Sequence, residues 1–149
     1  MTSYATIFKR FENKIESLEP QKLGDDNWNE LCVEYLNSAI AMIELDDLKI
    51  EHDFSNRDDE IQMFKEDLTN GEIEVLSLYM VVAWYDVKLN SLELTNFFYG
   101  SKDEKWESKK EHANYILAIQ EKYRKKARKY IRNHSSRNNS YLRGDNNEV

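Results

Sequence analysis

The sequence predicts an all-α protein: a helical bundle of about five or six helices around a central hydrophobic helix, with a long C-terminal helix and a disordered tail. Pro20 is the only proline and there are four glycines, while charged residues make up 33% of the chain. This composition favours long helices over turn-rich β structure. Between residues 73 and 89 only Glu74, Ser77, Asp86 and Lys88 are polar. A helix there would be apolar around most of its circumference and would need cover on several sides.

The first helix is expected over residues 4–18, where apolar residues recur at intervals of three and four. Thr2 or Ser3 can serve as its N-cap, and it ends before Pro20 and Gly24. Its apolar face consists of Tyr4, Ile7, Phe8, Phe11, Ile15 and Leu18.

The second helix is expected to begin near Asn27, whose side chain can cap it while Glu30 reaches back. One broad apolar face predicts that this helix packs on the core. That face consists of Trp28, Leu31, Cys32, Tyr35, Leu36, Ala39, Ile40 and Ile43.

Residues 46–54 read as a connection that places a few apolar anchors on the bundle. A shorter helix is then expected, capped by Ser55 and carrying Ile61, Phe64 and Leu68. Three acidic residues in its first turn, at positions 58–60, would complement the helix dipole.

The central helix is expected over residues 69–90, because Thr69 and Glu72 form a capping box and Asn90 can end it. At 100° per residue, Val81 and Tyr85 fall on the same narrow stripe as the polar residues of this helix. The sequence leaves two interpretations of this apolar interruption. Either a following segment of the chain covers Val81 and Tyr85, or the two residues contact a second subunit.

Residues 91–100 are expected to form a short helix or turn whose aromatic cluster closes the end of the bundle. Ser108 and Glu111 form another capping box, which predicts that the last helix begins there and continues to about Arg132. Its inner face should carry His112, Ile116, Ile119, Tyr123, Ala127 and Tyr130. Residues 1–132 would then form one domain, and the polar residues 133–149 a tail that orders only with a partner.

Enzyme signatures are weak in this sequence, and we expect no catalytic activity, no cofactor and no metal. The three histidines are far apart, and Cys32 belongs to a core-facing helical pattern. The four isolated glycines form no phosphate-binding loop, and clustered Cys and His ligands for zinc are absent from the sequence. Charges interrupt every apolar run well before the length of a membrane span, so we expect a soluble protein that does not contact membranes.

Charge is distributed unevenly along the chain. Residues 121–149 hold nine Lys or Arg and three Asp or Glu, a net charge of +6, so the remainder carries -7 - 6 = -13. The basic residues concentrate on the end of the last helix, and six of them are our candidate docking residues: Lys122, Arg124, Lys125, Arg128, Lys129 and Arg132. This segment could be a solvated helix face, a docking surface for an acidic protein, or a contact to a phosphate backbone. The acidic remainder would repel duplex DNA, which weakens the last interpretation.

Three stretches carry a family resemblance: RDDEIQMFKEDLTNGEIEVLSLYMVVAWYDVKLNSLEL (57–94), FYGSKDEKWES (98–108), and a long helix that ends in KARKYIRNHSS. In their order and pattern these stretches resemble the head-tail connector, or neck adaptor, proteins of tailed bacteriophages. The similarity covers most of the chain from Trp28 to about Arg132 and includes no catalytic signature.

The resemblance implies a structural virion protein of the neck, assembled in the host cytoplasm. Proteins of this group are helical and form rings, commonly dodecamers, that join the portal to the tail and line the DNA channel. The implied partners are other copies of the chain, the portal protein and other neck or tail proteins, with DNA only passing through. A small acidic regulator or immunity-type inhibitor with a basic protein partner is the alternative, and a DNA-binding packaging or regulatory protein is the third.

Overall fold

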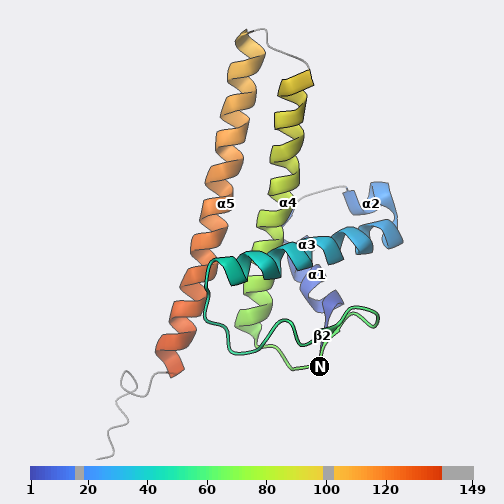
Figure 1. Ribbon diagram of the computed structural model, residues 1–149, viewed down its shortest axis with the longest axis vertical. Helices are drawn as coiled ribbons and strands as arrows, with labels where there is room; N and C mark the ends of the chain where they lie inside the picture. Colours follow the sequence, from blue (N-terminus) through green and yellow to red (C-terminus); the bar gives the residue numbers. More distant parts are fainter. Residues whose placement is uncertain (16–18, 99–102, 139–149) are drawn as a thin grey trace, which may run out of the picture.

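The computed structural model describes residues 1–15, 19–98 and 103–138, and most of this chain is helical, which confirms the all-α class. Three two-residue strands accompany the helices in these ranges, and β2 is labelled in Figure 1. In chain order the elements are β1 (Thr2–Ser3), α1 (Tyr4–Glu12), α2 (Glu19–Leu23), α3 (Asp25–Leu45), β2 (Arg57–Asp58), β3 (Met63–Phe64), α4 (Asn70–Phe98) and α5 (Asp103–Asn138).

Helix α4 contacts α1, α3 and α5. The predicted capping box at its start is confirmed: the Glu72 N–H donates to Thr69 Oγ1 over 3.2 Å, and the Thr69 N–H donates to Glu72 Oε2 over 2.8 Å. Residues Leu76 to Val82 of α4 are all fully buried. Other helices therefore cover this apolar stretch on several sides, as predicted.

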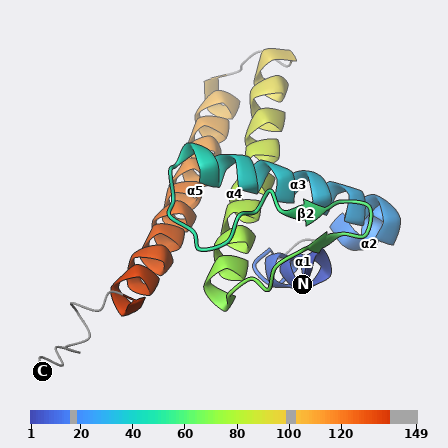
Figure 2. The same ribbon diagram turned by 60° about the horizontal axis from the view of Figure 1, so that its bottom comes forward.

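Helices α4 and α5 lie side by side and antiparallel, and their ends nearest residues 99–102 extend beyond α1, α2 and α3 (Figures 1 and 2). We call these ends, residues 87–98 and 103–117, the hairpin arm. Gln120 joins the two helices below the arm, because its amide donates to the Val82 carbonyl over 3.1 Å and to Asp86 over 2.6 Å.

The core between α1, α3 and α4 is rich in aromatic rings. Phe11 lies almost parallel to Trp28, with 6.2 Å between ring centroids, and Tyr35 is tilted against both. The Trp28 indole donates to Glu12 over 2.7 Å, which satisfies the polar edge of a buried ring. These contacts fix α3 against α1, as the apolar faces of both segments predict.

Residues 55–68 do not form the predicted helix. They form a hairpin of β2 and β3, and β1 pairs with β3 on the other side, in the antiparallel order β1-β3-β2. Asp58, expected to complement a helix dipole, accepts from the N–H groups of Glu60 and Ile61 and forms the turn. Ile61 is 62% exposed, so the helical spacing that suggested a buried face is coincidental. Pairing with the distant Thr2–Ser3 strand decides this structure.

The N-terminal helix is shorter than predicted, because α1 ends at Glu12, well before residue 18. Helix α3 begins at Asp25, close to its predicted start near Asn27, and follows Gly24, which has a positive φ of 76°. Asn27 does not cap α3, because its side-chain amide donates to the Leu23 carbonyl instead.

The two long helices extend beyond their predicted ends. Helix α4 continues past Asn90 to Phe98, and Ser91 stays within it by donating to the Val87 carbonyl over 3.0 Å. Helix α5 begins at Asp103, before Ser108, and ends at Asn138, beyond Arg132. The aromatic side chains expected at 97–99 and the end of the predicted tail, 139–149, lie outside the described residues.

Candidate docking surface

The second half of α5 separates apolar and basic residues onto different faces. Ala127 is fully buried, and Tyr123 and Ile131, one turn away on each side, pack against the core. The spacing of four places these three residues on one face. Lysines at 122, 125, 126 and 129 are exposed. Packing of the apolar face therefore holds the basic face outward.

His112 and Tyr130 were predicted to lie on the inner face of α5, but they do not. His112 is exposed and Tyr130 is 42% exposed, whereas Ile131 and the buried Gln120 contact the rest of the chain. A polar residue takes an inner position because Asp86 and the Val82 carbonyl of α4 offer its amide two acceptors.

The wall opposite α5 is built by the turn that ends α3. Asp47 has a positive φ of 51°, its N–H donates to the Glu44 carbonyl, and the Leu48 N–H donates to the Ile43 carbonyl. This pair of bonds is the Schellman arrangement that closes many helices. The turn stops α3 and brings Leu48 and Lys49 to face the basic residues of α5.

A buried hydrogen bond fixes the same turn to α4. The Tyr79 hydroxyl, on a fully buried ring, donates to the Asp46 carboxylate over 2.5 Å. Burial, together with the bond to Asp46, raises the pKa of Tyr79 well above its usual range, so the hydroxyl stays a donor at physiological pH. Arg124 of α5 approaches Met42 of α3, with 3.6 Å between Nη2 and Sδ.

Between this turn and α5 lies an open groove with a volume of about 1080 Å³, which we call the basic groove. Of its ten lining residues, seven are Lys or Arg, one is acidic and two are apolar. They are Asp47, Leu48, Lys49, Lys122, Lys125, Lys126, Arg128, Lys129, Ile131 and Arg132.

Five of the six predicted docking residues line the basic groove. The exception is Arg124, which turns toward α3. Lys49, Leu48 and Ile131 were not among the predicted docking residues. Lys49 and Leu48 lie in a connection without periodicity, and nothing in the sequence places that connection against α5.

The two residues of the predicted subunit contact, Val81 and Tyr85, lie in different environments. Val81 is 0% exposed, so this chain covers it and it offers no surface to a second subunit. Tyr85 is partly exposed and packs its ring against Trp84, with 4.9 Å between centroids. At Glu74 the polar stripe of α4 faces α1 rather than solvent. Glu74 pairs with Arg10 of α1 over 3.5 Å and with Lys14, just after α1, over 2.8 Å.

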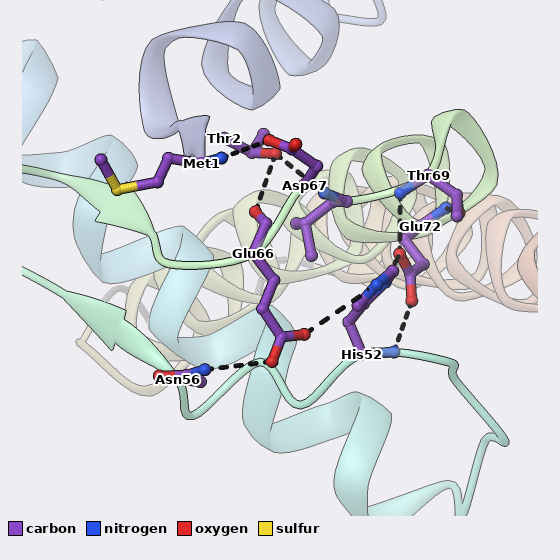
Figure 3. Close-up of polar contacts among 9 residues, drawn as sticks. Met1, Thr2, His52, Asn56, Glu66, Asp67, Thr69 and Glu72 are labelled. Carbon is purple, nitrogen blue, oxygen red and sulfur yellow. Dashed lines mark hydrogen bonds and ion pairs between the residues drawn. The ribbon is translucent and has the colours of Figure 1, made fainter.

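A second polar cluster joins the 46–54 connection to the start of α4 (Figure 3). Glu72 accepts from the His52 backbone N–H over 2.8 Å, and its other oxygen lies 2.8 Å from His52 Nδ1. Glu66 lies on the other side of the ring, 3.9 Å from Nε2, and accepts from Asn56. In this arrangement His52 and Glu72 tie three separate segments together, and the sequence offered no signal that would pair them.

The cluster shifts the pKa values of His52 and Glu72 in opposite directions, and both shifts favour the charged forms of the two side chains. The hydrogen bond to Glu72 raises the pKa of His52, and the nearby carboxylates add to this effect. Burial alone would raise the pKa of Glu72, but its hydrogen bonds with His52 and the Thr69 N–H outweigh burial and lower it.

The remaining groups of interest are the single cysteine and any cluster of metal-ligating side chains. Cys32 is fully buried, and burial raises the pKa of its thiol to about 12, which leaves it unreactive at neutral pH. Residues 1–15, 19–98 and 103–138 contain no group of three His, Cys, Asp or Glu placed to hold a metal. Within the same ranges, no helix has both the length and the apolar character needed to cross a bilayer.

Comparisons with protein-family models, with curated proteins and with solved structures gave no significant match to this chain.

Proposed function

We propose that this chain is a structural subunit of a ring-shaped head-tail connector of a tailed bacteriophage, joining portal to tail and lining the DNA channel. The proposal starts from the resemblance to that group, which covers most of the chain from Trp28 to about Arg132. The structural observation that carries it is the hairpin arm. Two long helices extend beyond the rest of the chain and present apolar side chains there, as a subunit that assembles with copies of itself requires (Figure 1).

The apolar side chains of the arm are Val87, Tyr115 and Leu117, which are 51%, 63% and 50% exposed. Ile116 is buried and lies one turn from Gln120, which contacts α4. Consider two antiparallel helices in contact. On each helix, the residue immediately after a contact residue points to the same side of the pair. Val87 follows Asp86 and Leu117 follows Ile116, so the two exposed residues share one face of the arm.

This face gives the proposed subunit contact a more accessible position than Val81. Tyr85 precedes Val87 by two residues and therefore points to the opposite side of α4, so it does not belong to this face. A helical body assembled around α4 would then contact its neighbours through the arm, which extends from one end of the molecule (Figures 1 and 2). The groove residues of α5 lie between 122 and 132, in the half of α5 away from the arm. In this arrangement the groove is free to dock the portal.

The charge distribution also supports the proposal. Residues 1–120 carry a net charge of -13, and seven of the ten groove residues lie in the remaining segment. A channel wall of the same sign as DNA lets the duplex pass without adhering. The docking surface would stay outside the channel.

The mass of the full-length protein in solution, measured alone and in the presence of portal rings, tests this function. We expect assemblies many times the 17.8 kDa chain mass. The double variant Val87→Glu/Leu117→Glu should abolish them, because it places charges in the contact face. Leu45→Glu is the matched control, because Leu45 is 84% exposed at the end of α3, away from the arm. Wild-type protein that stays monomeric in both conditions would overturn the connector proposal.

A further inference from the structure

The basic groove combines an apolar floor with a cationic rim. Leu48 from the turn after α3 and Ile131 from α5 are each partly buried and meet in the groove. The aliphatic stems of the surrounding lysines extend this apolar surface while their ammonium groups stay in water. A surface of this kind can bury apolar side chains of a ligand and pair with its negative charges at the same place.

Within the described residues, the positive charge of the groove is largely uncompensated by ion pairs. Arg128 pairs with Glu121 over 3.7 Å. Among the residues that the structure describes, the other six cations of the groove make no ion pair: Lys49, Lys122, Lys125, Lys126, Lys129 and Arg132. Such a concentration in a chain of net charge -7 favours an anionic partner.

Two smaller cavities lie next to the basic groove. Lys49 and Ile131 also line a narrow second cavity, together with Val75 and Tyr130. Tyr130 in turn lines a third one of about 450 Å³, next to Arg10. The basic groove alone is as large as the largest usual small-molecule sites, which reach about 1,000 Å³. An open groove of this volume, with seven cations among its lining residues, has room for a polypeptide segment.

We propose that the basic groove binds an acidic amphipathic segment of a partner protein. Apolar side chains of the segment would contact Leu48 and Ile131, and its carboxylates would meet the cationic rim. An amphipathic helix laid in a groove uses this combination of apolar anchors and flanking charge. The inference rests on the docking role proposed above and specifies the chemistry of the docked segment.

Duplex DNA fits the same surface less well. A phosphate backbone is bound by charge and hydrogen bonds and gains nothing from an apolar floor. The net charge of -13 on residues 1–120 would repel a duplex that extends past the groove. A test must therefore separate an acidic amphipathic segment from a phosphate polymer.

The probe is a fluorescein-labelled synthetic helix of about 18 residues, roughly five turns, with Leu on one face and Glu on the others. A second peptide has the same composition, but its Leu residues are distributed around the helix. A labelled DNA duplex is the third probe. Fluorescence anisotropy with the full-length protein should show at least about tenfold tighter binding of the first peptide than of the other two probes.

Two variants locate the binding. Lys125→Glu/Lys129→Glu should weaken the amphipathic peptide at least about tenfold, because both lysines are exposed on the rim. Leu48→Ala should weaken the same peptide severalfold and leave DNA binding unchanged. Lys9→Glu/Lys22→Glu is the control, since it makes the same charge change at exposed lysines of α1 and α2, outside the groove and the hairpin arm. Circular dichroism melts of each variant would verify that the fold is retained.

Equal binding of the two peptides, equal losses in the groove and control variants, or tighter binding of DNA would each overturn the proposal. The connector function is tested separately, because groove variants should still assemble at the wild-type mass. Assembly without peptide binding refutes the groove inference alone. Peptide binding by a chain that never assembles refutes the connector alone.

Discussion

Replacing Glu72 by Ala should destabilise the fold by about 2 kcal/mol. The carboxylate accepts from the Thr69 N–H, from the His52 N–H and from the His52 ring, each over 2.8 Å. Alanine leaves two backbone N–H groups without acceptors at a site that water can partly reach. Each loss then costs about 1 kcal/mol, at the low end for an unpaired buried donor. For a chain of this size, about 2 kcal/mol lowers the melting temperature by about 4–8 °C.

The assay is urea unfolding at pH 6, followed by circular dichroism. Glu66→Ala is the control, because Glu66 contacts the same His52 ring at 3.9 Å from a side chain that is 40% exposed. That exposed pair should contribute about 0.5 kcal/mol or less. If Glu72→Ala cost no more than Glu66→Ala, the cluster would not tie the connection to α4 as we describe.

Three further predictions concern the same region. The hydrogen bond between His52 and Glu72 raises the pKa of His52. The stability that this bond adds is therefore complete below about pH 6.5 and is lost as pH rises through the raised pKa. Wild-type unfolding free energy should therefore fall between pH 6 and pH 9 more than that of His52→Asn, and equal slopes would contradict the pairing. Asp47→Val should cost about 1–2 kcal/mol, because a β-branched residue resists positive φ, whereas Asp47→Gly should cost nothing measurable in the same urea titration. Tyr79→Phe should lose about 1 kcal/mol, since it removes only the bond to Asp46, and an unchanged unfolding midpoint would show that this bond does not hold the turn.

The helices were predictable where periodicity, capping and burial agree. The Thr69 and Glu72 capping box and the apolar run after it fix the start of α4 from local sequence alone. The 55–68 segment could not be predicted in the same way, because its acidic start suits a helix and a turn equally well. Pairing of Met63–Phe64 with Thr2–Ser3, which is far away in the chain, decides between them.

The candidate site was predictable on one side only. The basic end of α5 is evident from composition, and five of its six proposed residues line the groove. The opposite wall depends on a left-handed residue at Asp47 and on a buried bond from Tyr79, neither of which leaves a local signal in the sequence. Val81 was ambiguous for a related reason, since a stripe on a helix does not reveal whether its own chain covers it.

The measurement that tests the proposed function most directly is electron microscopy of tailed-phage particles purified from the source of this chain, labelled with antibodies against it. The connector account predicts label at the neck, between capsid and tail, in every intact particle. Label on the capsid faces or at the tail tip, or virions that lack the protein, would contradict it.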